Sequence, residues 1–186
     1  HHDAWYIYYT IPSDCQVVTG NDGQPMFYMR YNPSLIDYNF TLSKLSGGKE
    51  SEFALLCLAD PQCKDASHRT RFVNETVADI RTHINQKGIP CYGVTLGDVA
   101  YSEGSRNCVS QMPHLRKHMS KSNIGMPVFQ TMGNHDYTYF SSSVIIEPDE
   151  TSSTYNIKAQ RAFEDVFGPI NYSWDRGDAH IVCMRN

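Results

Sequence analysis

Three short polar segments of this 186-residue chain carry side chains that could bind a metal ion or move a proton. Each directly follows an apolar run: Asp60-Pro61-Gln62, Gly97-Asp98 and Gly133-Asn134-His135-Asp136. Carboxylate and amide oxygens suit hard divalent cations, and imidazole suits zinc or iron. The simpler interpretation of the last segment alone is a Gly-Asn turn with a surface His–Asp pair, because short motifs often match by chance. Two similar junctions upstream favour a shared site.

The elements that must position these segments alternate between strands and helices. The continuous apolar run Phe53–Ala59 predicts a strand buried on both faces. Further strands are predicted at 91–96 and 128–131, with helices at 67–87 and 107–121. For the first helix, Ser67 is the expected N-cap and Gly88 the expected stop. This alternation indicates βαβ units and a largely parallel sheet. Side chains at the carboxyl ends of strands ~4.8 Å apart can converge on two ions ~3.5–4 Å apart, a spacing used in phosphate-ester hydrolysis.

The flanks of this pattern predict less regular structure. Residues 4–45 are rich in aromatic and β-branched residues, which predicts β structure, and 46–50 reads as a linker. We therefore divide the chain into a β segment, 1–48, and a second region, 49–186. Because the first has too few strands to bury both of its faces, we expect it to pack on the second or to belong to a module begun upstream. The last expected elements are a strand at 37–45, a loop at 140–154, a helix at 155–167 and a hairpin at 171–184.

Composition excludes some classes of function. The net charge is −4 and no Lys/Arg-rich run occurs, so nucleic-acid binding is not indicated. No apolar run approaches the ~18 residues of a membrane span. The chain opens on His1-His2, which fits a tag, an internal start or a removed leader, and a removed leader would imply an extracytoplasmic protein.

The six cysteines form no CxxC pair, so a zinc ribbon is not indicated. Cys57, Cys91 and Cys183 lie in apolar runs and are expected to be buried. The other three, in loops or at a helix start, leave room for one disulfide of undetermined pairing: Cys15, Cys63 and Cys108.

In their order and spacing, the three polar segments resemble the motifs of the calcineurin-like metallophosphoesterase family, over residues 53–186. The segment ending in Asn39-Phe40-Thr41-Leu42 resembles the N-terminal β module of a bacterial branch. The resemblance implies an α/β fold, a layered αββα sandwich, preceded by a small β segment. It also implies two divalent or trivalent metal ions (Mn, Fe or Zn), which activate a water that hydrolyses phosphate mono- or diesters.

The resemblance assigns a role to each site residue. Asp60 and Gln62 would bind the first metal and Asp98 would bridge both. Asn134 would bind the second metal and a substrate oxygen. His135 would act on the leaving group, as an acid or as a positive charge. Asp136 would orient His135 through a hydrogen bond.

The chain departs from the family pattern in two ways. Gln62 stands where the family usually has histidine, and it offers a neutral oxygen ligand. The family's later ligands, a His and a Gly-His-x-His motif, should follow the hairpin, but the sequence ends at Asn186. His180 lies within an apolar strand and is expected to be structural. The sequence thus predicts the front half of a catalytic domain, completed by the remainder of the same protein or by another chain. Alone, it should bind metal poorly and be nearly inactive.

Alternative interpretations stay open. The chain could be a non-catalytic binding module that keeps the fold with an incomplete site, or a carbohydrate- or protein-binding β module beside a vestigial domain. His114 and His118 have helical i, i+4 spacing that can bind zinc, but without an acidic ligand nearby a solvated or packed face is expected. Asp65 and His68 would either line a substrate pocket or begin the helix.

Overall fold

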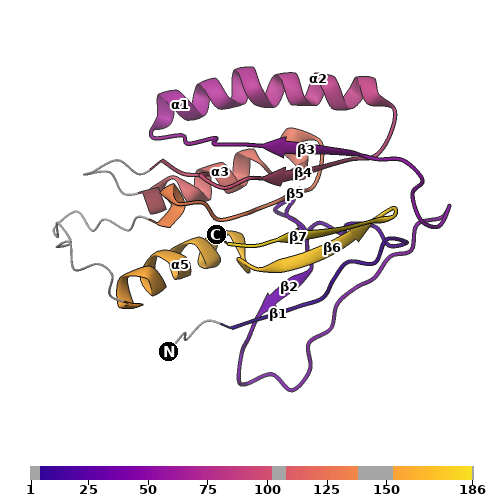
Figure 1. Cartoon of the computed structure of the whole chain (residues 1–186), viewed down its shortest axis with the longest axis horizontal. Coiled ribbons are helices and arrows are strands. Elements are labelled where there is room, and N and C mark those ends of the chain that lie inside the picture. The colour runs from indigo at the N-terminus through magenta and orange to yellow at the C-terminus, as the bar shows by residue number, and fades with distance from the viewer. Residues whose placement is uncertain (1–4, 102–107, 138–152, 186) are drawn as a thin grey trace.

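The computed structural model describes residues 5–101, 108–137 and 153–185. It is a mixed α/β fold with a parallel three-stranded sheet of order β3-β4-β5 and two antiparallel pairs, β1-β2 and β6-β7 (Figure 1). The strands are β1 Tyr6–Tyr8, β2 Tyr28–Arg30, β3 Ala54–Leu58, β4 Cys91–Thr95, β5 Val128–Phe129, β6 Tyr172–Arg176 and β7 Ala179–Cys183. The helical elements are α1 Ala66–Arg71, η1 Phe72–Val77, α2 Ala78–Lys87, η2 Cys108–Ser110, α3 Met112–His118, α4 Lys121–Ile124, η3 His135–Tyr137 and α5 Ser153–Phe167.

The connection from β3 to β4 is one long helical segment, as predicted. It begins at the N-cap Asp65, whose side chain accepts a hydrogen bond from the His68 amide at 3.0 Å. The sequence predicts Ser67 as the cap, but the helix begins two residues earlier because the Asp65 carboxylate binds the free amide of His68. The segment runs through α1, the π-helical turn η1 and α2, and it ends at Gly88, where φ is +67°. Glycine takes this left-handed conformation without steric cost, which makes it the stop that the sequence predicts.

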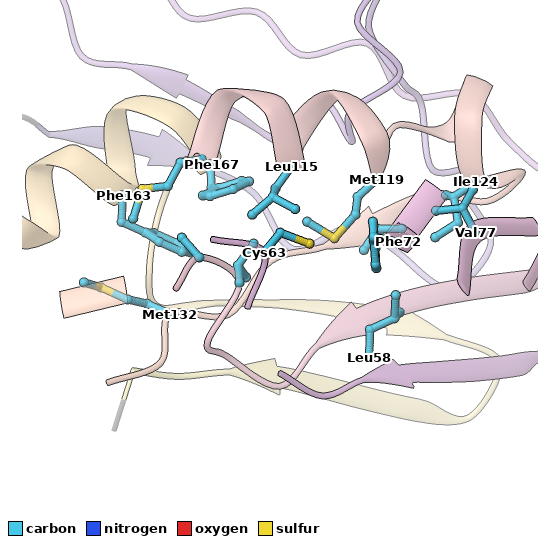
Figure 2. Packing of buried hydrophobic residues seen from close by; sticks show 14 of the residues in the cluster. Leu58, Cys63, Phe72, Val77, Leu115, Met119, Ile124, Met132, Phe163 and Phe167 are labelled. Atoms are coloured by element: carbon cyan, nitrogen blue, oxygen red, sulfur yellow. The ribbon is translucent and has the colours of Figure 1, made fainter. Parts of the chain in front are cut away.

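One face of the parallel sheet packs against the helices. Leu58 of β3 and Val128 of β5 point to this side, because alternate residues of a strand face opposite ways. Figure 2 shows Leu115 of α3, Met119 at the C-cap of that helix and Phe163 of α5 gathered in the same cluster. The burial of these side chains holds the helices on the sheet.

The opposite face carries a second, aromatic core. Phe129 of β5 stacks on Trp174 of β6 with ring centroids 4.1 Å apart and planes 10° apart. Tyr92 of β4 lies 5.7 Å from the same indole ring, and Phe27 lies 4.8 Å from Tyr172. The β6-β7 pair therefore lies over β4 and β5, on the side away from α1 and α2 (Figure 1).

The N-terminal segment packs against this aromatic core, which is one of the two arrangements expected for a segment with so few strands. Ile11 is fully buried and pairs with Trp174 in an isolated parallel bridge. At the end of the predicted linker, Glu50 accepts a hydrogen bond from the Tyr92 hydroxyl at 2.8 Å. Its carboxylate also lies 3.7 Å from Nε of the buried Arg176. The last residue of the linker is thus anchored at the protein interior.

Two predicted features of the strands are wrong. Residues 37–45 form no strand: Lys44 makes only an isolated antiparallel bridge with Cys15, and the Tyr38 hydroxyl is hydrogen-bonded to the backbone of Asn32 within its own loop. β3 is not buried on both faces: it is an edge strand on which Leu55 is 38% exposed and Cys57 is also exposed. The apolar run could not reveal this, because the aromatic residues of β6 cover β4 and β5 instead.

The other predicted elements agree more closely with the structure. The helix expected at 107–121 is divided, because Ser120 adopts an extended conformation (ψ 150°) between α3 and α4. Cys91 and Cys183 are buried as predicted, and Cys15 and Cys63 are free thiols. The Cys108 side chain and most of the predicted 140–154 loop lie outside the described residues. In the described chain no helix combines the length and apolar character that crossing a membrane requires.

Candidate metal centre

The three polar segments meet at the carboxyl-terminal edge of the parallel sheet. Asp98 follows the central strand β4, and its backbone carbonyl accepts a hydrogen bond from the backbone amide of Gln62 at 3.1 Å. Its carboxylate Oδ1 accepts another from the backbone amide of His135 at 2.9 Å. Asp98 therefore joins the loop after β3 to the loop after β5.

The Gln62 side chain lies between two carboxylates. Its Nε2 donates to Asp60 Oδ1 at 3.0 Å and to Asp98 Oδ2 at 3.2 Å. The amide hydrogens thus supply the positive partner that two neighbouring carboxylates need. Rotation of the Gln62 side-chain amide by half a turn would place its Oε1 where Nε2 now lies. Oxygen atoms of Asp60, Gln62 and Asp98 would then face one point.

The backbone at these three positions is strained. Asp60, Gln62 and Asp98 have φ values of +50°, +37° and +51°, and no other non-glycine residue in the described ranges has a positive φ. Such a conformation costs about 1–3 kcal/mol for a residue with a Cβ and persists only where the surroundings impose it. Strain that falls on the predicted ligands alone is typical of a functional site.

Two glycines allow the loops to come this close. A Cβ on Gly133 would lie 2.2 Å from the Asp98 amide nitrogen, and one on Gly97 would lie 2.8 Å from the Gly133 Cα. Any side chain at either position would push the loops after β4 and β5 apart. The glycines of the Gly97-Asp98 and Gly133-Asn134 pairs are therefore needed for close backbone contact.

The contacts of Asp136 differ from the hydrogen bond to His135 that the resemblance implies. Its carboxylate is buried and accepts three backbone hydrogen bonds, from Val99 at 3.1 Å, Ala100 at 2.7 Å and Gly133 at 3.0 Å. None of its hydrogen bonds among the described residues goes to the His135 ring, because the side chain points inward. Burial raises the pKa of this carboxyl to about 6, although the three amides oppose the shift.

Asn134 and His135 lie at the rim of the site. The Asn134 side chain is exposed, and His135 is half-buried. The His135 ring lies parallel to that of Tyr101, with centroids 6.0 Å apart and planes 7° apart. Lys64 Nζ lies 5.7 Å from the centroid of the same Tyr101 ring. Sequence reasoning missed Tyr101 and Lys64, although each lies within three residues of a predicted ligand.

The remaining candidates lie apart from this cluster of donors. Asp65 caps α1, which supports the interpretation that it begins the helix, and His68 lines a cleft with Pro61 and Cys63. His180 lies opposite Asp175 in the β6-β7 pair, with its Nδ1 2.5 Å from that carboxylate. This cross-strand pair agrees with the expected structural role.

The environment of His118 on α3 is positive, which opposes a zinc site there. Burial lowers the pKa of His118 below 6.5, and the charges of Arg69, His114 and Lys117 lower it further. The unfolded state therefore binds this proton more tightly than the native state. As the pH falls below about 6.5, we expect the free energy of unfolding to decrease more in the wild type than in His118→Gln. Urea denaturation at a series of pH values measures this, and identical slopes in the two proteins would contradict it.

The groups that the structure brings together are the carboxylates of Asp60 and Asp98 and the side-chain amide of Gln62, whose nitrogen faces them, with Asn134 at the rim. Within the described ranges, no group of three or more His, Cys, Asp or Glu side chains is placed to hold a metal ion. Comparison with models of protein families, with curated proteins and with solved structures gives no match to this chain.

Proposed function

We propose that the edge formed by the loops after β3, β4 and β5 is part of a two-metal centre in a phosphoesterase related to the calcineurin-like family. The parent protein would hydrolyse phosphate mono- or diesters. The observation that carries this proposal is the meeting of Asp60, Gln62 and Asp98 in left-handed conformations, with the Gln62 amide between the two carboxylates. The helix–sheet–sheet order of the described layers is compatible with part of an αββα sandwich.

The donor set fits hard or borderline divalent cations. Asp60 and Gln62 would hold the first ion, Asp98 would bridge to the second, and Asn134 would hold the second through its amide oxygen. The bound ions would lower the pKa of a water molecule so that it can attack phosphorus. Mn, Fe and Zn all agree with a set that further imidazoles would complete, from the rest of the same protein or from another chain.

The other residues of the site would act on the substrate. Asn134 is exposed at the rim, where its amide can bind a phosphate oxygen. His135 is within the same loop and would protonate the leaving oxygen or place a positive charge beside it. The backbone amide of His135 holds Asp98 in place, so the same residue supports the metal ligand and the substrate.

A non-catalytic binding module is the second candidate. It is favoured by the small number of charged donors, since only Asp60 and Asp98 contribute carboxylates to the cluster in the described part of the chain. In that case the fold would be retained and a partner would bind elsewhere on the surface.

The substitution Asp98→Asn distinguishes these functions. We expect it to weaken Mn²⁺ or Zn²⁺ binding by more than about tenfold, because it removes the one carboxylate that touches both neighbouring loops. Isothermal titration calorimetry, with elemental analysis of the purified protein, measures the affinity and the number of ions. The matched control is Asp79→Asn, which changes the same charge on the exposed face of α2. Equal affinities in all three proteins, or no binding by the wild type, would refute the metal centre in this chain.

A further inference from the structure

The ring of His135 is stacked against an aromatic ring from another loop, that of Tyr101. Its plane is 7° from that of Tyr101, and the ring centroids are 6.0 Å apart. Parallel, offset rings attract each other within about 4.5–7 Å. The contact therefore favours one orientation of the imidazole over rotation about its Cβ–Cγ bond.

The backbone beneath Tyr101 is held by the buried carboxylate of Asp136. Asp136 accepts hydrogen bonds from the amides of Val99 and Ala100, the two residues that precede Tyr101. Ala100 also pairs with Cys63 in an isolated parallel bridge. The backbone that leads into Tyr101 is thus held in place on the loop after β4.

The same carboxylate fixes the other partner of the ring contact. Asp136 accepts a third hydrogen bond from Gly133, two residues before His135, and is itself the next residue in the chain after His135. One buried side chain therefore sets the separation between the backbones that carry the two rings. The loop after β3 contributes as well, because Lys64 Nζ lies within cation–π distance of Tyr101, at 5.7 Å.

We propose that Tyr101 is a positioning residue for His135, and that Asp136 orients His135 through Tyr101 and the backbone. The inference rests on the proposed function, in which His135 acts on the leaving group of a phosphate ester. Proton transfer requires the donor nitrogen to be held close to its target at a defined angle. A ring stacked on a tyrosine that is itself fixed from two loops meets this requirement without a side-chain hydrogen bond from Asp136.

Nuclear magnetic resonance of the metal-free 186-residue protein, with isotope-labelled histidine rings, tests the proposal. His135→Gln assigns the His135 signals. In the wild type we expect nuclear Overhauser effects between the Tyr101 and His135 rings and an upfield ring-current shift of the His135 ring protons. Tyr101→Leu should abolish that shift, whereas Tyr101→Phe should retain it, because the contact needs the ring and not the hydroxyl.

The control Tyr8→Leu removes a half-exposed tyrosine from β1 and should leave the His135 signals unchanged. Absence of the ring-to-ring effects in the wild type would overturn the proposal, and this holds even if Tyr101→Leu fails to fold. An unchanged His135 shift in a folded Tyr101→Leu protein would also overturn it. A Zn²⁺ titration of the same samples tests metal binding separately, because Tyr101 is outside the proposed donor set. No response to zinc would refute metal binding by this chain and leave the ring contact standing.

Discussion

Trp174→Ala is expected to lower the free energy of unfolding by about 3–5 kcal/mol, the usual loss for a buried aromatic residue. Trp174 is fully buried, stacks on Phe129 and contacts Tyr92. It also pairs with Ile11 through the backbone. Its removal would leave a cavity at the point where β4, β5, β6 and the N-terminal segment meet.

Urea denaturation followed by far-ultraviolet circular dichroism measures this loss. The chain supplies its own control, because the only other tryptophan, Trp5, is 66% exposed. Trp5→Ala should change the free energy of unfolding by less than about 1 kcal/mol. Similar losses in the two variants would mean that the aromatic core does not hold the N-terminal segment to the sheet.

The second large effect is expected for Asp136→Ala, at about 3 kcal/mol of unfolding free energy. The substitution leaves the amides of Val99, Ala100 and Gly133 without their acceptor, and each unsatisfied buried donor costs about 1–3 kcal/mol. The lower cost of burying alanine in place of a carboxylate offsets part of this sum. The Asp136→Ala protein should therefore be less stable than the wild type but still fold at low temperature.

Hydrogen exchange locates the effect within the molecule. The amide of Ala100, which makes the shortest of the three bonds, should exchange much faster in Asp136→Ala than in the wild type. Asp79→Ala on the exposed face of α2 is the matched control and should change neither the exchange nor the stability. Unchanged protection of Ala100 would contradict the assignment of Asp136 as the residue that joins the two loops.

The sequence predicts those parts of the fold that depend on local signals. The strand at β4, the long helical segment and its stop at Gly88 follow from apolar runs, periodicity and glycine chemistry. The edge position of β3 does not, because exposure of Leu55 and Cys57 depends on where the distant β6-β7 pair lies. Similarly, the break at Ser120 arises where the Lys121 backbone amide donates a hydrogen bond to the Gly23 carbonyl, a contact between residues that lie about half the chain length apart in sequence.

In the candidate site, too, some features could be predicted from the sequence and others could not. The convergence of Asp60, Gln62 and Asp98 follows from their places at the ends of neighbouring parallel strands. The partners of Asp136 are backbone amides, which look alike in every sequence, so its inward orientation could not be predicted. The Tyr101–His135 contact joins two loops through ring geometry, and no spacing rule along the chain encodes that geometry.

The three left-handed backbone positions have a consequence for how variants of this protein would be selected. Glycine at residue 60, 62 or 98 would relieve about 1–3 kcal/mol of strain, so selection for folding alone would favour losing these side chains. Selection for ligand binding would keep them and accept the lower stability. The frequency of glycine at these positions among functional variants would therefore record the balance between the two pressures, independently of any assay of turnover.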